Sequence, residues 1–181
     1  MVGVPQDARF HPEGDVWTHV LLVRRALDDA IAMTRELFPE VGSDEDRCLL
    51  RIAAWVHDLG KAAATKVVGG RYVAPGHEKS DRFNEVFRRL GEPWKKLWAS
   101  TSYEDRKTLL YVVTRHMGVS DQRGLEARIA RNLRSREEFL RRRAWLAVAF
   151  MVMDRLGCAS PTRVADARLV IDAARRGMNL V

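Results

Sequence analysis

The sequence lacks long apolar runs and has little cysteine, and each shortage excludes a class of protein. Its longest apolar run, Ala144–Met153, is too short to cross a bilayer, and residues 1–14 are polar, unlike a signal peptide. The only two cysteines, Cys48 and Cys158, lie far apart and form no Cys-x-x-Cys motif. We therefore expect no membrane span, no disulfide framework and a reducing, cytoplasmic location.

Sustained alternation of apolar and polar residues, the pattern of a half-buried strand, is also missing. Apolar residues instead recur every three or four positions from Val16 onwards, which predicts one helix from Asp15 to about Phe38. A second helix is expected between Ser43 and Gly60. The glycine-rich segment 67–76 predicts a loop or a small hairpin. Further helices are predicted near residues 77–90, 93–99, 104–116, 125–133, 135–156 and 161–175.

A chain of 181 residues with no internal repeat and no linker is the length of one domain. We predict an all-α fold, with an N-terminal loop segment over residues 1–14 and a single helical domain over residues 15–181. At this size about 70% of the unfolded chain's surface is buried, so a hydrophobic core needs no disulfides.

Basic residues exceed acidic ones by 31 to 24, which gives a formal net charge of +7. A positive field favours anionic partners such as nucleotides or RNA. The arginines are scattered along the chain, however, and the one run, Arg141–Arg143, is typical of a solvated helix face. The charge gives mild support for an anionic substrate and no more.

The dipeptide His57-Asp58, at the end of an apolar segment, is the most informative feature of the chain. A buried imidazole and a buried carboxylate are costly unless they are paired or bound to a metal. Neighbouring side chains on a helix diverge by about 100°, so both reach one ion only when it lies over the helix end, and Gly60 predicts such an end. The alternative is an ordinary core histidine held by a salt bridge.

Three more histidines and one aspartate lie where the same site would use them. His19 falls in the first turns of the first predicted helix, whereas His77 and His116 lie at the start and the end of later ones. Asp154 closes the most apolar helix. Each has an ordinary alternative, such as a core histidine, a cation at a helix C-terminus or an ion pair with Arg155. Together they favour a divalent metal site, since such ions take histidine nitrogens and carboxylate oxygens.

Two cations beside these candidate ligands, Lys61 and Arg115, are candidates for binding phosphate. Lysine would act as a point charge and arginine as a bidentate donor, although either also suits a solvated surface. Lys61 is favoured because it follows the glycine that exposes the helix end. We expect the segment around His11 to be a loop over the mouth of the site, and we assign His11 no catalytic role.

In chain order, these residues resemble the pattern of the HD-domain superfamily of metal-dependent phosphohydrolases. The resemblance implies a helical HD-domain bundle. When His77 and His116 are included, the order of histidines and aspartates along the chain resembles that of members that bind two metals. A first metal would be held by His19, His57, Asp58 and Asp154. Asp58 would bridge to a second metal held by His77 and His116.

Three segments, 11–19, 57–61 and 76–78, more specifically resemble the HD domain appended to bacterial CCA-adding tRNA nucleotidyltransferases and related RNA end-healing phosphoesterases. That domain is associated with 2′,3′-cyclic phosphodiesterase, 2′-nucleotidase and phosphatase activities. No glycine-led strand with paired aspartates precedes His11, so we expect no CCA addition. Residues 78–81, Glu-Lys-Ser-Asp, stand where those enzymes usually carry small residues, so we expect a different pocket shape.

The resemblance implies a phosphoesterase for nucleotide or RNA-terminal phosphates, with 2′,3′-cyclic phosphate and 2′-phosphate ends favoured. Water activated by two metals would attack phosphorus, with Asp58 and Lys61 catalytic and Lys61 and Arg115 binding phosphate. Manganese, nickel or cobalt are expected, with magnesium or iron as alternatives. Other readings of the sequence remain: a 5′-nucleotidase or deoxynucleotide phosphohydrolase, a di-iron oxygenase, and a non-catalytic module that binds RNA or nucleotide.

Overall fold

The first helix begins where Asp15 caps it, because the Asp15 carboxylate accepts a hydrogen bond of 2.8 Å from the amide of Thr18. The computed structural model describes residues 1–89, 91–117 and 125–178. The single helix predicted for residues 15–38 is wrong, since it divides at Ala26 into α1 (Val16–Arg25) and α2 (Leu27–Thr34). There the Ala26 amide donates to the carbonyls of both Leu22 and Val23, which tightens the turn.

The other described helices follow the predicted order, except that the short helix α4 was not predicted, and the glycine-rich segment forms the small hairpin that was one of its two predicted structures. The hairpin turns at Gly69 and Gly70, and both have positive φ angles (56° and 73°), as a tight two-residue turn requires. The elements are α3 (Asp44–Val56), α4 (Lys61–Ala64), β1 (Lys66–Val68), β2 (Arg71–Val73), α5 (Ser80–Phe87), α6 (Glu92–Ser100), α7 (Tyr103–Arg115), α8 (Ala127–Leu133), α9 (Glu138–Gly157) and α10 (Arg163–Gly177).

The helix predicted to begin at His77 begins instead at Ser80. Gly76 has a φ of 68°, and the residues around His77 form a turn in which the amide of Lys79 donates to the carbonyl of Gly76. The predicted end of this helix at Leu90 lies outside the described residues.

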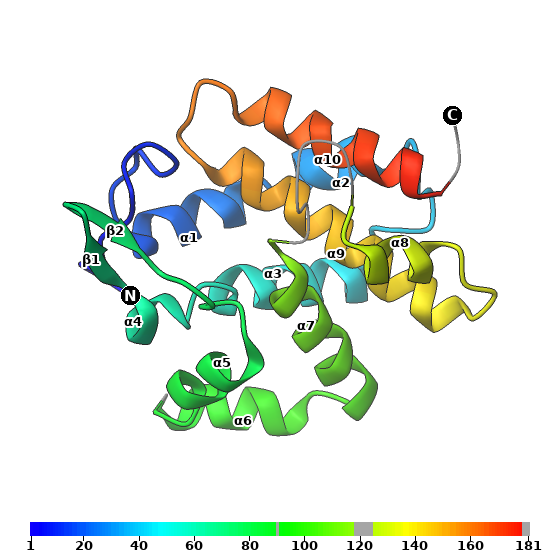
Figure 1. Cartoon of the computed structure of the whole chain (residues 1–181). Coiled ribbons are helices and arrows are strands. Elements are labelled where there is room, and N and C mark those ends of the chain that lie inside the picture. The colour runs from blue at the N-terminus through cyan, green and yellow to red at the C-terminus, as the bar shows by residue number, and fades with distance from the viewer. Residues whose placement is uncertain (90, 118–124, 179–181) are drawn as a thin grey trace.

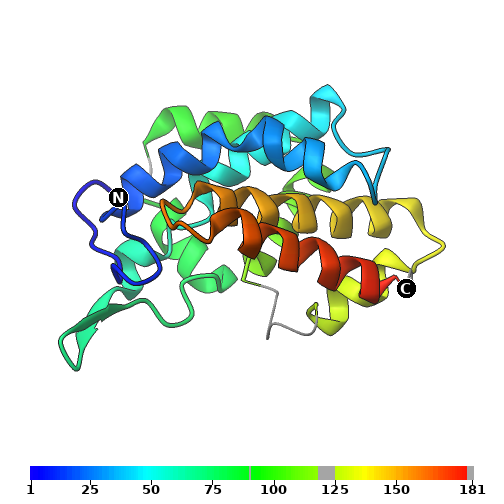
Figure 2. The same ribbon diagram turned by 90° about the horizontal axis from the view of Figure 1, so that it is seen from above.

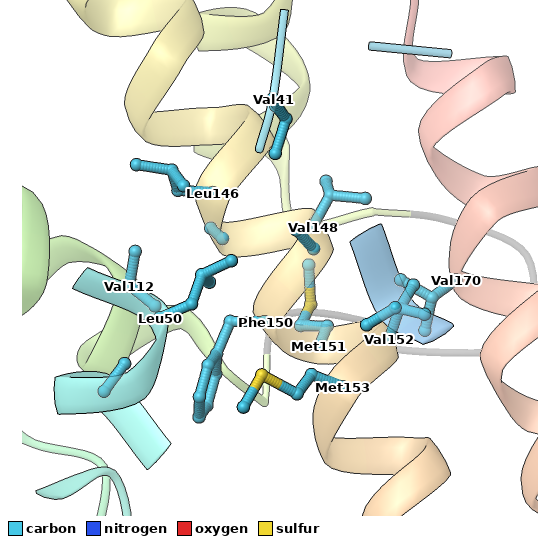
Figure 3. Packing of buried hydrophobic residues seen from close by; sticks show 14 of the residues in the cluster. Val41, Leu50, Val112, Leu146, Val148, Phe150, Met151, Val152, Met153 and Val170 are labelled. Carbon is cyan, nitrogen blue, oxygen red and sulfur yellow. The ribbon is translucent and has the colours of Figure 1, made fainter. Parts of the chain in front are cut away.

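Helix α9 forms the centre of the bundle, with α1, α2, α3, α7, α8 and α10 packed around it (Figure 1, Figure 2). Every side chain from Leu146 to Met153 is fully buried, which explains why this stretch of the helix is apolar on all sides. Figure 3 shows Phe150 of α9 beside Leu50 of α3, and both belong to the buried hydrophobic cluster. Asp154 follows this run directly and is therefore carried into the interior.

The N-terminal loop and the hairpin lie side by side at one end of the bundle (Figure 1, Figure 2). Residues 1–14 contain no helix, and Pro5 forms an isolated bridge with Asp15 that returns the loop to the start of α1. Within the described residues, no helix has both the length and the apolar character needed to cross a membrane.

Candidate metal centre

His57 and Asp58 lie in the turn between α3 and α4, at the helix end that the sequence predicted. Gly60 in this turn packs directly on the backbone of His77. A Cβ added to Gly60 would lie 2.0 Å from the His77 carbonyl oxygen, so only glycine allows the approach. This contact brings His77 to Asp58.

His19 and Asp154 meet because α1 and α9 cross closely. A Cβ added to Gly157 would lie 2.6 Å from Cα of Val23, so the glycine allows the two backbones to touch. As a result, Nε2 of His19 lies 3.0 Å from Oδ1 of Asp154, although the two residues are 135 positions apart. His116, which caps the C-terminal end of α7, reaches the same region.

All six predicted ligands are buried, and the structure brings them together as two groups of three. In the first group the ligand atoms of His19, His57 and Asp154 lie within 4.8 Å of one another; in the second, those of Asp58, His77 and His116 do. Asp58 joins the groups: its Oδ2 lies 3.3 Å from Nε2 of His57 and its Oδ1 lies 3.2 Å from Nε2 of His77. One carboxylate therefore faces both groups.

The four histidines are oriented alike, with Nδ1 directed at an oxygen atom and Nε2 at the centre. Because a carbonyl only accepts hydrogen bonds, Nδ1 must carry a proton in three of them, so Nε2 is the nitrogen that can bind a metal. The Nδ1 partners are the carbonyls of Ala54 for His57 (3.1 Å), Ala74 for His77 (2.8 Å) and Val113 for His116 (2.6 Å), and Oε1 of Glu13 for His19 (2.8 Å).

Glu13 is a site residue that the sequence analysis missed. Its side chain is 2% exposed, its Oε1 lies 2.9 Å from Nδ1 of His11, and its Oε2 accepts from the amide of Ala159. Burial opposes its ionisation, but the hydrogen bonds from His11 and His19 outweigh burial and hold the Glu13 pKa well below its usual range. A charged carboxylate therefore stands behind His19.

Cys158 also lies close to this carboxylate, so that His11, Glu13, His19 and Cys158 form a third cluster of potential ligands. Burial and the Asp154 carboxylate raise the pKa of the Cys158 thiol, which disfavours the thiolate that a metal needs. The thiol donates to the backbone carbonyl of Asp154 instead. This cluster adjoins the first group of ligands through His19, which belongs to both.

Without a metal ion, the two buried carboxylates of the centre, Asp58 and Asp154, depend on neighbouring side chains for positive charge. Burial lowers the pKa of His57, but the charges of Asp58 and Asp154 outweigh it and raise that pKa to about 10. His116 behaves in the opposite way, since burial and then the charge of His57 lower its pKa to about 3. Burial raises the Asp58 pKa, but His57 and Lys61 outweigh it and hold that pKa well below its usual value.

The residues fit divalent metal ions. Both oxygens of Asp58 and Nε2 of His57 are buried without a well-formed hydrogen bond in the described part of the chain. Two ligand atoms that each lie about 2.1 Å from one ion and form a right angle at it are about 3 Å apart. The distances from the Asp58 oxygens to Nε2 of His57 and of His77 are close to this spacing. Nε2 of His77 and Nε2 of His116 are 3.3 Å apart, which is a contact that a shared ion would stabilise.

Of the two predicted phosphate-binding cations, the structure brings only Lys61 to the site. Its Nζ forms an ion pair with Oδ2 of Asp58 at 2.8 Å and donates a hydrogen bond to the side chain of Gln6. Arg115 is not among the cavity-lining residues and pairs with Glu126 (3.4 Å), since it points about 100° away from its neighbour His116. Arg155, not Arg115, is the arginine at the site, since it contacts Asp154 and lines the cavity.

The fold and this centre define an HD-domain protein. The chain matches the HD domain family over residues 17–156 and belongs to that family, whose members are generally metal-dependent phosphohydrolases. The prediction of an all-α HD-domain bundle is thereby confirmed.

Curated relatives share the name multifunctional CCA protein. The one from Cupriavidus pinatubonensis is 30% identical over 176 residues, 97% of this chain and 32% of the relative. The one from Pasteurella multocida is 38% identical over 78 residues, 43% of this chain and 16% of the relative. The chain thus spans a third or less of the length of these relatives, and no solved structure matches it.

Proposed function

We propose that this protein is a metal-dependent phosphoesterase that hydrolyses nucleotide or RNA-terminal phosphates, with 2′,3′-cyclic phosphate and 2′-phosphate ends favoured. The observation that carries the proposal is the pair of buried ligand groups joined by Asp58, which opens into a cavity of about 880 Å³. A cavity of this size suits a nucleotide. Similarity to multifunctional CCA proteins supports an RNA end as the substrate.

His19, His57 and Asp154 would hold one divalent ion, His77 and His116 the other, and Asp58 would bridge them. Divalent ions supply a nucleophile at neutral pH and stabilise the charge that develops on phosphoryl oxygens. The Nδ1 hydrogen bonds of His57, His77 and His116, and the contact of His19 Nδ1 with Glu13, keep the rings oriented while substrate binds and leaves. Their geometry and tautomer are therefore set before substrate arrives.

Lys61 and Arg155 would place the substrate. The Lys61 ammonium is held between Asp58 and Gln6 on the cavity wall, where it would neutralise a phosphate oxygen. The Arg155 guanidinium has one nitrogen on Asp154 and further donors for a second phosphate oxygen. Hydrolysis would join a water oxygen to phosphorus and break one phosphorus–ribose oxygen bond, and the ribose oxygen would leave with a proton.

The test is hydrolysis of 2′,3′-cyclic AMP, 2′-AMP, 3′-AMP and 5′-AMP by metal-stripped protein resupplied with Mn²⁺, Ni²⁺, Co²⁺ or Mg²⁺ singly. We expect cleavage of the cyclic and 2′ substrates, lost at least 1,000-fold in Asp58→Asn because the bridging charge is removed, an order of magnitude typical of catalytic groups. Asp46→Asn is the matched control, since Asp46 is a buried aspartate outside the site.

Other outcomes would decide against the favoured substrates. Cleavage of 5′-AMP alone would make the protein a 5′-nucleotidase. Oxygen consumption by the iron-loaded protein, with no hydrolysis, would make it an oxygenase. Nucleotide binding without turnover in any metal would make it a binding module.

A further inference from the structure

The cavity above the metal centre is much larger than a phosphate group and has an outer wall of its own. The ligands Asp58, His77, His116 and Asp154 form part of its lining. The rest comes mainly from the N-terminal loop, from the hairpin with the residues after it, and from the start of α10. A substrate whose phosphate lies on the ligands would therefore extend past the loop and the hairpin.

Two aromatic side chains on this outer wall remain open to solvent. Phe10 of the N-terminal loop is 63% exposed and Tyr72 of β2 is 43% exposed, and both line the cavity. Neither belongs to the hydrophobic core cluster or packs against it as a partly buried member. Large exposed aromatic rings that stabilise no core, in the mouth of a site, are typical of a binding surface.

Polar groups beside the Phe10 ring and elsewhere in the cavity lining suit a flat, polar-edged aromatic ligand better than an aliphatic one. The guanidinium of Arg9 lies 5.2 Å from the centre of the Phe10 ring and is itself held by the carboxylate of Asp7. The same wall carries Thr162, whose hydroxyl donates to Asp166. A ring on this wall would find stacking surfaces beside hydrogen-bonding groups.

We propose that Phe10 and Tyr72 form a stacking site for the nucleobase of a substrate whose phosphate lies at the metal centre. The inference rests on the proposed function and names the part of the substrate that the outer cavity binds. Stacking is tolerant of base identity, so the site would accept different nucleotides at an RNA end. The loop and the hairpin, which lie side by side in Figure 1, would each supply one ring.

The test compares a substrate that carries a base with one that does not. 2′,3′-Cyclic AMP and glycerol 1,2-cyclic phosphate share the five-membered cyclic phosphate, but only the first has a base. We expect Phe10→Ala and Tyr72→Ala each to lower kcat/KM for the nucleotide about tenfold, mainly through KM, which is within the range for loss of one stacked base. The base-free substrate should change less than about twofold.

Two further variants give the controls. Tyr72→Phe should retain nucleotide activity, because the ring remains. Tyr103→Ala, which removes an exposed tyrosine outside the cavity lining, should affect neither substrate. Equal loss on both substrates, or no loss on the nucleotide, would overturn the stacking site and leave the proposed phosphoesterase intact.

If neither substrate is hydrolysed, the proposed function fails and binding decides the inference. Calorimetry would then measure the affinity of 2′-AMP and of glycerol 2-phosphate for the Mn²⁺-loaded protein. Tighter binding of 2′-AMP that both alanine variants weaken would support the stacking site. Equal affinities, or no binding of 2′-AMP, would overturn it.

Discussion

At the scale of single residues, the site depends on groups that bind no metal themselves. Glu13 contacts Nδ1 of His19 and thereby orients the ring whose Nε2 faces Asp154. Its negative charge also increases the basicity of the imidazole, as carboxylates behind metal-binding histidines do. Glu13 is thus a positioning residue, since it acts through His19.

We predict that Glu13→Gln weakens metal binding while the fold is retained. The amide keeps the shape of the side chain but loses its charge, and carboxylate partners of this kind typically contribute about 10- to 100-fold to metal affinity. Calorimetric titration with Mn²⁺ should show one weakened site and one unchanged site. Glu36→Gln, which changes an exposed glutamate, is the control; unchanged affinity in Glu13→Gln would leave Glu13 with a purely structural role.

At the scale of helices and turns, glycines set the positions of the ligands. Gly157 lets α9 touch α1, and Gly60 lets the turn after α3 touch the backbone at His77. These close backbone contacts at Gly60 and Gly157 bring the two ligand groups together, and the ligands themselves do not form them. Loss of either glycine should therefore separate ligands while the helices remain.

Gly60→Ala is expected to disrupt the second ligand group selectively. The added Cβ would collide with a backbone oxygen, so His77 must move away from Asp58. A displacement of about 1 Å in a catalytic site costs on the order of 100-fold in rate. Metal analysis should show the content falling from two ions to about one per chain. Gly177→Ala is the control and should keep both ions, because its added methyl group would make only ordinary contacts. If Gly60→Ala also kept both ions, the proposed role of Gly60 would be wrong.

At the scale of the whole molecule, the sequence indicated the candidate ligands that the fold brings together, but not the residues that support them. Asp154 directly follows the apolar run of α9, and His57 lies beside Asp58 just after α3; polar residues at such positions are visible in the sequence. The role of Glu13 depends on where a loop of 14 residues packs, and that packing is determined by tertiary contacts with residues near 159. Arg115 shows the converse error, since sequence adjacency to His116 does not place it on the same side of a helix.

Metal binding should stabilise the whole fold, and more strongly as pH rises. In the metal-free protein His57 has a pKa of about 10, raised from 6.5 by Asp58 and Asp154, so it is protonated at neutral pH. A metal must displace that proton, because only the neutral ring is a ligand, and each pH unit below 10 therefore costs about tenfold in apparent affinity.

At a Mn²⁺ concentration 100 times Kd the added stability is about 2.7 kcal/mol, or roughly 5–10 °C in Tm for a chain of this size. Thermal unfolding at fixed subsaturating Mn²⁺ should show the metal-induced shift growing from pH 6.5 to pH 8. Asp58→Asn should lose most of the shift, and a shift independent of pH would show that His57 gives up no proton to the metal.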